Sequence, residues 1–337
     1  MARYVLKRLA IAPLLLIGIV TIAFLISRLI PADPLVSIVG ERNMGNPTVV
    51  AAAEQQWGLD KSLPAQYAAY MGNLAQGDFG TSFRTKSSVW DDLTERLPAT
   101  AELTLAALVF GVVAGVGLGV VAAVKHDRAP DHVARLFALT GSSIPVFWLG
   151  LILLFVFYAR LGWLPGPGRL PPRTDPPAHL TGLYTIDSLA AGNFSLFWEC
   201  SKRLIMPAFV LGWGLTGIVS RLIRASMLDE LYADYVRTAR AKGLTERSVM
   251  VRHVLRNALL PTITIVGLSF GALLTGAVLT ETIFSWNGIG SYAVEATRTL
   301  DYPAINGVCI LGGAIFILTS LATDVLYAVA DPKIRLS

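Results

Sequence analysis

The 337-residue sequence is short of charged side chains. Asp, Glu, Lys and Arg make up 15% of the residues, against about 25% in an ordinary soluble domain. The deficit is uneven, because the charges gather in short segments and the stretches between them are nearly uncharged. This pattern excludes a soluble domain with one large core and indicates a protein that crosses a membrane several times.

Histidine, cysteine and nucleotide-binding motifs are also scarce. The two cysteines, Cys200 and Cys309, fall outside and inside an apolar stretch, so we expect no disulfide. No G-x-x-x-x-G-K-[ST] motif is present, so we expect the chain not to cradle ATP itself. We expect no enzyme activity, no catalytic residues, no metal and no cofactor, because every histidine lies between the apolar stretches. The histidines are His126, His132, His179 and His253.

Six stretches are long and apolar enough to cross the hydrocarbon core as helices, which takes about 20 residues. The first begins like a signal peptide, but its apolar run exceeds the usual ~7–15 residues and no A-x-A site follows, so we expect a retained span. Since only helices satisfy their own backbone in lipid, the predicted fold class is an all-α polytopic membrane protein with six transmembrane helices. The predicted spans are 9–30, 100–124, 134–159, 204–223, 259–280 and 304–330.

The basic residues predict the orientation of the chain. If both termini are cytoplasmic, 16 of the 28 Lys and Arg residues fall in short inner segments, whereas the longer outer segments hold 12. This density follows the positive-inside rule, so we expect cytoplasmic N and C termini. The net charge of +5 then reflects cytoplasmic loops beside the lipid bilayer, and we expect no nucleic-acid partner.

This topology divides the chain into three parts: 1–30, the cytoplasmic N-terminus and first span; 31–99, an extracytoplasmic segment; and 100–337, a core of five spans. The core includes a Pro- and Gly-rich extracytoplasmic loop, 161–203, and a cytoplasmic loop, 228–258. Small residues in "GVVAGVGLG" (111–119) and "GLSFG" (267–271) have the spacing that lets helices pack closely. For any one of these glycines, helix packing is favoured over a pore-lining role.

Three acidic residues lie at or near the spans. Glu102 and Glu281 fall near outer ends, and Asp324 falls about two turns from the inner end of the last span. An ion-coupled carrier usually places such groups at mid-bilayer. None is clearly central, so a satisfied contact between helices is favoured over ion coupling for each.

The densest cationic segment is "DYVRTARAKGLTERSVMVRHVLRNALLP", residues 234–261. Its first part predicts a short helix ending at Gly243, and its second part a helix capped by Thr245. Val249, Val251 and Leu255 supply the apolar positions of the second helix. Two interpretations stay open: a cationic anchor that obeys the positive-inside rule, or a helix pair that passes a push from a soluble partner into the membrane.

This segment resembles the permease signature of the dipeptide/oligopeptide/nickel group of bacterial ABC importers. The general loop of such importers has Glu-Ala-Ala and then a Gly; here Arg237, Thr238, Ala239 and Gly243 stand at those places, as in the peptide branch. "SWNGIG" has Asn287 where the family often has Pro. The resemblance extends over almost the whole chain through "PADPL", "WGLDKSLPAQY", "GDFGTSFRTKSSVWDDLTERLPATAELT", "AAVKHD", "LTGSSIPVFWLGLILL", "PPAHLTGLYTIDSLAAGN", "TETIFSWNGIG" and "DPKIR".

The resemblance implies a type I ABC importer permease fold in the bacterial inner membrane. It implies a second homologous permease subunit, two cytoplasmic ATPase subunits and an extracytoplasmic substrate-binding protein as partners. In the fifth span it suggests Gly267, Gly271 and Thr275 as pore-lining residues. The residues implied to dock the ATPases are Arg237, Ala239, Arg240, Lys242, Gly243, Leu244, Arg252, His253, Arg256 and Asn257.

The implied function is ATP-driven import of small peptides, with dipeptides favoured. The same machinery serves oligopeptides, D-amino-acid dipeptides, nickel complexes, and oligosaccharide- or opine-like solutes, and these alternatives stay open. Two other classes are weighed against it. An ion-coupled secondary transporter would depend on Glu281 or Asp324, and an intramembrane enzyme is disfavoured because no histidine lies at depth.

Overall fold

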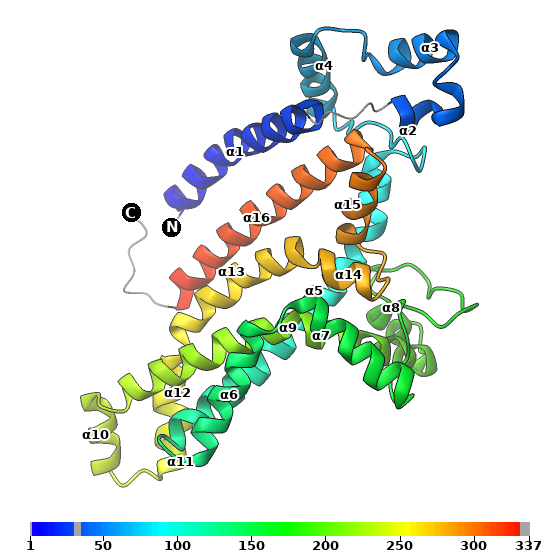
Figure 1. The fold of residues 1–337 in the computed structure, drawn as a ribbon. Coiled ribbons are helices and arrows are strands. Elements are labelled where there is room, and N and C mark those ends of the chain that lie inside the picture. Colours follow the sequence, from blue (N-terminus) through cyan, green and yellow to red (C-terminus); the bar gives the residue numbers. More distant parts are fainter. Residues whose placement is uncertain (1, 30–34, 331–337) are drawn as a thin grey trace.

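The computed structural model describes residues 2–29 and 35–330, which fold almost entirely as helices (Figure 1). Within these residues there is no β-strand, only an isolated bridge between Thr81 and Ser88. The first half comprises α1 (Ala2–Leu29), α2 (Leu35–Val39), the short 3-10 helix η1 (Glu41–Asn43), α3 (Pro47–Trp57), α4 (Leu63–Ala75), α5 (Val89–Val124), α6 (Ala129–Ser143), α7 (Val146–Leu153) and the π-helix η2 (Leu154–Arg160). The second half comprises α8 (Tyr184–Ala190), α9 (Phe194–Glu230), α10 (Asp234–Ala241), α11 (Glu246–Ser248), the π-helix η3 (Val249–Val254), α12 (Leu255–Ala258), α13 (Leu260–Gly276), α14 (Val278–Ile283), α15 (Ile289–Arg298) and α16 (Tyr302–Ala330).

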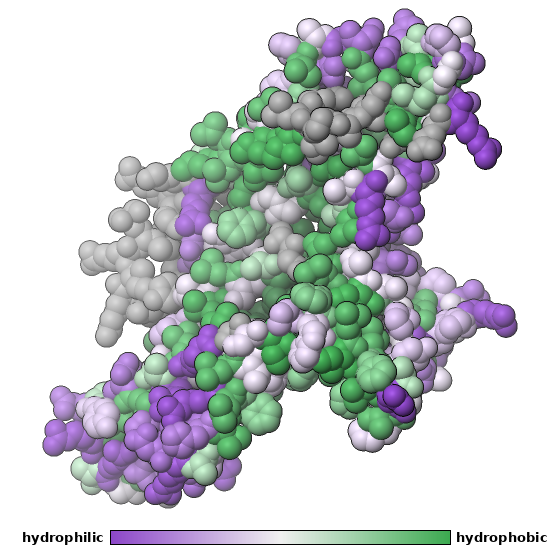
Figure 2. Space-filling view, in the orientation of Figure 1, coloured by the Kyte–Doolittle hydropathy of each residue, from purple (hydrophilic) through white to green (hydrophobic). Residues whose placement is uncertain are grey.

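Four helices of the described chain are long and apolar enough to cross a membrane alone, namely α1, α5, α9 and α16. Two more crossings are possible if α6 with α7–η2 and α11–α12 with α13 each count as one span, although the first pair bends by 104° and the second by 50°. The six predicted spans therefore all coincide with helices, and the all-α prediction is confirmed. Figure 2 shows hydrophobic residues over the middle of the molecule, as lipid contact requires.

The third predicted span, 134–159, is not one straight helix. It breaks at Ile144 and Pro145, where Ile144 adopts extended backbone (φ −83°, ψ 124°). Proline disfavours a helical conformation in the residue before it, which explains the break. The stretch beyond Leu153 continues as a π-helix.

Two spans begin earlier than the apolar pattern indicates. Helix α5 starts at Val89, although 100 was predicted, and α9 starts at Phe194, although 204 was predicted. In α5 the extra turns hold charged residues that find partners: Asp92 Oδ2 accepts hydrogen bonds from the hydroxyls of Thr85 (2.7 Å) and Tyr292 (2.9 Å). Cys200 consequently lies inside α9, not outside a helix, and it is a free, buried thiol.

Helices α5 and α9 form the centre of the molecule and pack through small residues. A Cβ placed on Gly115 would lie 2.7 Å from the Val219 side chain, and one on Gly119 would lie 2.7 Å from the Ser220 carbonyl oxygen. Only glycine allows so close an approach. The predicted packing role is confirmed for Gly111, Gly115 and Gly119, whereas Gly117 has no atom within 4 Å of an added Cβ.

Helices α1, α16 and α13 lie side by side along one flank of this centre (Figure 1). Arg8 of α1 and Asp324 of α16 form an ion pair of 2.7 Å, so the two ends lie at the same level. Beyond the opposite ends of α1 and α16 lies the small subdomain α2–α4. The terminal "DPKIR" with Lys333 and Arg335, most of "PADPL", and the side chains of Arg3 and Lys7 lie outside the described residues.

Candidate functional site

Helices α10 to α12 project from one end of the molecule between the long helices α9 and α13 (Figure 1). Figure 2 shows hydrophilic residues gathered over this end. All ten residues predicted to dock a partner lie on this segment, which we call the coupling helices (residues 234–258). The structure therefore brings the predicted set together in one place.

Helix α10 ends as its sequence predicts. Gly243 has a φ of +78°, a left-handed conformation that favours glycine. Its N–H donates to the carbonyl of Arg240 (2.9 Å), and the N–H of Leu244 donates to the carbonyl of Ala239 (3.4 Å). These two bonds form a Schellman motif, which turns the chain sharply into the next helix.

The second coupling helix begins at its predicted cap but winds differently from the prediction. The Thr245 hydroxyl accepts a hydrogen bond from Ser248 N–H (3.4 Å). From Val249 the chain forms a π-helix, so the two fully buried apolar residues, Val249 and Val254, are five positions apart. The predicted apolar position Val251 is wrong: it lies two positions after the buried Val249, on the opposite side of the helix, and is 56% exposed.

The inner face of the coupling helices joins the core of the membrane helices. Val236, Val249 and Val254 are fully buried in one hydrophobic cluster with Ile223 and Met227 of α9. Ala239, a predicted docking residue, is buried in the same cluster. Because packed cores transmit displacement rather than absorb it, a movement of α10 or α12 reaches α9 directly.

The outer face of the coupling helices is polar and mainly cationic. Arg240 spans the turn at Gly243 and binds Glu246 (Nε to Oε1, 2.8 Å), which ties the two helices together. Leu244 and Val251 add exposed apolar side chains to this face, and Tyr232, which the sequence analysis did not single out, adds another just before the segment. The other exposed docking residues are Arg237, Lys242, Arg252 and Arg256, whereas His253 and Asn257 are half-buried.

Asn257 and Glu230 both face the hydroxyl of Tyr235 between the coupling helices and the end of α9. The Tyr235 hydroxyl donates a hydrogen bond to Glu230 Oε2. Burial, together with this bond, raises the pKa of Tyr235, so the hydroxyl stays protonated and remains a donor. This contact fixes the start of α10 relative to α9.

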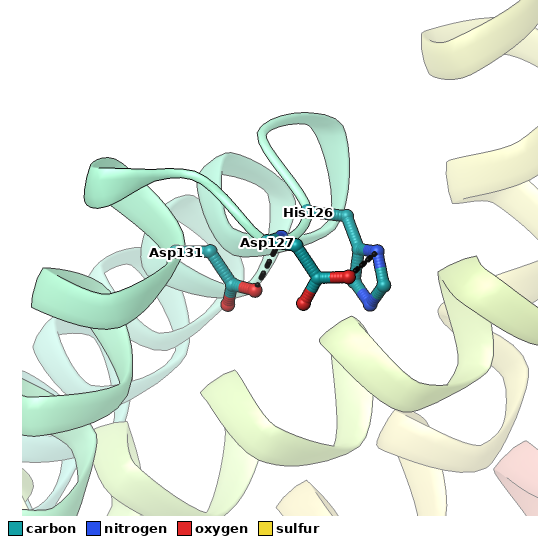
Figure 3. A group of neighbouring side chains, drawn as sticks. All are labelled: His126, Asp127 and Asp131. Carbon is teal, nitrogen blue, oxygen red and sulfur yellow. Dashed lines mark hydrogen bonds and ion pairs between the residues drawn. The ribbon is translucent and has the colours of Figure 1, made fainter.

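Three side chains beside this end, His126, Asp127 and Asp131, have a spacing that suits a metal ion (Figure 3). Asp131 is fully buried, but both its oxygens are already in use. Arg224 of α9 binds them with Nε (2.8 Å) and Nη2 (2.9 Å), and the Asp127 N–H donates to Oδ2 (3.0 Å). The cluster is therefore an ion-pair connection between α6 and α9, which the sequence reasoning missed because the partners are 93 residues apart.

At the opposite, outer end the acidic residues are buried and bound. Arg169 binds Glu102 at 2.6 Å, and the side chains of the pair are only 10% and 5% exposed. The Arg169 guanidinium also lies 3.6 Å from the ring centroid of Tyr184. Glu102 further accepts hydrogen bonds from the Thr185 N–H and hydroxyl, both at 2.8 Å. These contacts anchor the loop 161–203 onto α5.

Glu281 is fully buried at the junction of α5, α14 and α15. Its carboxylate accepts hydrogen bonds from the Thr100 hydroxyl (2.6 Å) and from Ser291 N–H (2.9 Å) near the start of α15. Burial raises the pKa of Glu281, although these hydrogen bonds oppose the rise. In the same link Asn287 has a φ of +51°, which asparagine tolerates and proline cannot adopt.

Glu102, Glu281 and Asp324 thus all engage in contacts between elements of the fold. This arrangement agrees with the favoured interpretation of satisfied polar contacts. The hydroxyl and amide partners were not singled out from the sequence, because Thr100 and Glu281 are 181 residues apart.

The suggested pore-lining glycines lie against α16. A Cβ on Gly267 would lie 2.3 Å from Thr323 Oγ1, and one on Gly271 would lie 2.6 Å from Thr319 Oγ1. The side chain of Thr275 lies outside the described residues. Gly267 also lines an apolar groove of about 660 Å³ between α5, α13 and α16, together with Thr262.

Comparison with known proteins gives two family matches along the chain. Residues 115–336 match the family described as "Binding-protein-dependent transport system inner membrane component", and residues 1–104 match the N-terminal part of such membrane components. The chain is 43% identical over 335 residues to the dipeptide transport system permease protein DppB of Alkalihalophilus pseudofirmus, covering 99% of this chain and 100% of that one. It is 43% identical to the probable D,D-dipeptide transport system permease protein DdpB of Escherichia coli, covering 95% and 94%.

A solved structure shares the fold. A chain of the MetNI methionine ABC transporter, in an inward facing conformation, superposes with a TM-score of 0.52 at 14% identity, covering 71% of this chain and 96% of that chain. At this identity the likeness concerns the fold alone.

Proposed function

The chain belongs to the family of binding-protein-dependent transport system inner membrane components, and on that premise we propose that it is the permease subunit of an ATP-driven importer of small peptides. Dipeptides are the favoured substrates, because relatives that match this chain over nearly its whole length are named as dipeptide permeases. Those relatives differ in the dipeptide that their names state, so the permease itself leaves the substrate open within this class.

One observation carries the proposed mechanism. The coupling helices expose a cationic face to solvent and insert their apolar face between the ends of the membrane helices. A simple cationic anchor needs only the charges. The Schellman turn, the Arg240–Glu246 pair and the fully buried Val249 and Val254 add a defined shape that a partner can grip.

We propose that two cytoplasmic ATPase subunits grip this face. Arg237, Lys242 and Arg252 would meet acidic groups of the ATPases, and the exposed Leu244 would enter an apolar hollow. Closure of the ATPases on ATP would displace α10 and α12, and the shared core would pass the displacement to α9 and α5. The membrane helices would then exchange between inward-open and outward-open arrangements.

We propose that the other two kinds of partner, a second permease subunit and a substrate-binding protein, contact other surfaces of the chain. A second permease subunit would complete the translocation path, and a substrate-binding protein would deliver peptide to the outer segments 31–99 and 161–203. We propose that α13 lines the path where it borders the groove, with Gly267 and the buried Thr262 as the residues nearest to solute.

Co-purification tests this proposal. The chain is expressed with its neighbouring genes, isolated in detergent, and assayed for ATP hydrolysis with and without binding protein loaded with alanyl-alanine. The expected result is a stoichiometric complex whose hydrolysis rises with loaded binding protein. A chain that purifies alone and transports peptide in proteoliposomes under an ion gradient would contradict the proposal and favour a secondary carrier.

A further inference from the structure

A separate hollow of about 330 Å³ lies at the outer side, where α3, α4 and the segment 78–83 meet α1 and the start of α16. Figure 1 shows this region at the end of the molecule opposite the coupling helices. Aromatic rings form much of its wall. They include Phe24, Trp57, Tyr70, Phe79, Phe83 and Tyr302.

Two amide oxygens of this wall, Gln66 Oε1 and Asn306 Oδ1, lack hydrogen-bond partners among the described residues. Asn306 is only 5% exposed, and its amide lies near the Tyr70 hydroxyl without bonding its own oxygen to any described donor. Buried polar atoms are almost always paired, so this group of unpaired atoms in one hollow indicates that something else supplies their partner.

The chemistry of that partner follows from the atoms that face it. The Gln66 amide nitrogen donates to the backbone carbonyls of Lys61 (2.8 Å) and Leu59 (3.3 Å), which fixes the orientation of the amide and leaves its oxygen as the unpaired atom. Gln66 Oε1 and Asn306 Oδ1 are acceptors without a donor of their own. A group that satisfies both must carry more than one donor hydrogen, as an ammonium does.

The surrounding rings favour positive charge on that group. Six aromatic rings line the hollow. Faces of aromatic rings attract cations. At the rim, Asp78 and Lys61 place charges of both signs, which suits a ligand that carries an ammonium and a carboxylate.

We propose that this hollow binds a primary ammonium group, held by Gln66, Asn306 and Tyr70 within the aromatic wall. Two sources offer that group at the outer surface: the N-terminus of a short peptide and the headgroup of an ethanolamine phospholipid. The peptide source rests on the proposed function. The charges of both signs at the rim favour it.

The test uses the full chain, purified with its partner subunits but without binding protein, in phosphatidylcholine nanodiscs. Calorimetry measures the binding of alanyl-alanine and of N-acetyl-alanyl-alanine, which lacks the ammonium. We expect only the free amine to bind. Asn306→Leu and Gln66→Leu should each weaken binding roughly tenfold or more, since each removes an acceptor from a charged donor.

Two further variants sharpen the test. Asn306→Asp keeps the acceptor and adds a negative charge, so it should bind the ammonium more tightly than the parent chain. Gln76→Leu is the matched control, because Gln76 caps the same helix α4 but does not line the hollow, and it should leave binding unchanged.

The lipid source is read from native mass spectrometry after reconstitution with phosphatidylethanolamine. Retention of that lipid by the parent chain and its loss in Asn306→Leu, without peptide binding, supports the ammonium site and assigns it to lipid. If neither ligand depends on Asn306 or Gln66, the hollow holds water alone and the proposal is overturned.

Uptake of alanyl-alanine, measured with binding protein added back, separates this proposal from the proposed function. Ammonium binding without uptake contradicts only the function. Uptake without ammonium-dependent binding contradicts only the site.

Discussion

The coupling helices at one end and the junction around Glu102 and Glu281 at the other end handle charge in opposite ways. The coupling helices at the cytoplasmic end expose Arg237, Lys242 and Arg252. The residues that these helices bury in the core are apolar. At the outer end, Glu102 and Glu281 are buried, and each is held by several hydrogen bonds from elements far apart in the chain.

This difference indicates which end exchanges partners. A buried charge needs fixed partners, because losing one leaves the charge desolvated and unpaired. An exposed cation loses little when it changes partner, because water and counterions replace the contact. We therefore expect the outer junction to move as one piece and the coupling face to be the surface that is gripped and released.

The largest expected effect comes from breaking the buried pair at the outer end. Arg169→Met leaves Glu102 buried without its cation, which should destabilise the fold by about 3–5 kcal/mol. Thermal unfolding followed by size-exclusion chromatography measures this as a fall in Tm. The double variant Glu102→Gln with Arg169→Met should recover much of the loss.

The control for that comparison is a partly exposed pair at the same end. Lys202 and Glu199 lie 3.0 Å apart, with side chains 33% and 39% exposed. Lys202→Met should cost less than about 1 kcal/mol. Equal losses from Arg169→Met and Lys202→Met would contradict the role given to burial.

Substitution of Asp187 should give the next largest loss of stability, and this loss should depend on pH. Burial opposes ionisation of this carboxyl, but hydrogen bonds from the Thr181 hydroxyl and N–H and from the Gly182 N–H outweigh burial and lower its pKa. Asp187→Asn keeps an acceptor for Thr181 but turns a donor toward Gly182 N–H, which should cost about 1–3 kcal/mol at neutral pH.

The sign of the pH effect follows from the lowered pKa. The stabilisation by Asp187 is fully present above the ordinary Asp value of about 3.9 and is lost as pH falls through the lower value in the fold. The difference in Tm between the parent chain and Asp187→Asn should therefore be constant from pH 5 to 7 and shrink below pH 4. A difference that grows on acidification would exclude this origin.

Substitution of Gly243 tests the proposed role of the coupling helices. A larger residue there meets no atom within 4 Å but must adopt a φ of +78°, so Gly243→Leu should cost only about 1–2 kcal/mol in stability. Its effect on function should be greater, because the altered turn misplaces the gripped face. We expect membrane insertion to persist while peptide uptake per ATP hydrolysed falls.

Two further variants are compared with Gly243→Leu. Gly243→Asn should retain more coupling, since asparagine tolerates the left-handed conformation. Gly117→Leu is the matched control, because Gly117 also has open space around it but lies inside the regular helix α5. Normal uptake by Gly243→Leu would count against the proposal that this turn is the contact gripped by the ATPases.

The sequence was informative where local chemistry decides the structure. Lipid requires long apolar helices, so the four single-helix spans and the two bent helix pairs all fall on predicted apolar stretches. Gly243 and Thr245 act as the caps that their residue types favour. The error at Val251 arose because residues two positions apart, such as Val249 and Val251, lie on opposite sides of a helix, and the π-helix pairs Val249 with Val254 instead.

Long-range pairing could not be predicted in the same way. Glu102 and Arg169 are 67 residues apart, and Asp131 and Arg224 are 93 residues apart. Each side chain has many possible partners until the helices are placed. The helices and caps of the cationic segment 234–258 were thus predictable because the segment is contiguous, whereas the outer junction exists only in the assembled fold.

The smallest expected effect comes from the pair Arg240–Glu246, which repeats the chemistry of Arg169–Glu102 in water. The atoms lie 2.8 Å apart, close to the distance in the buried pair, but the side chains are 41% and 63% exposed. A double-mutant cycle with Arg240→Gln and Glu246→Gln should give an interaction energy of about 0.2–1 kcal/mol, which falls as the salt concentration is raised.

An interaction energy as large as that of the buried pair would show that the turn at Gly243 is held as firmly as the outer junction. The proposed division between a gripped end and a fixed end would then fail. A small, salt-sensitive value would mean that the turn keeps its shape through Gly243 and its core contacts, leaving Arg240 free to exchange Glu246 for a group on the ATPase.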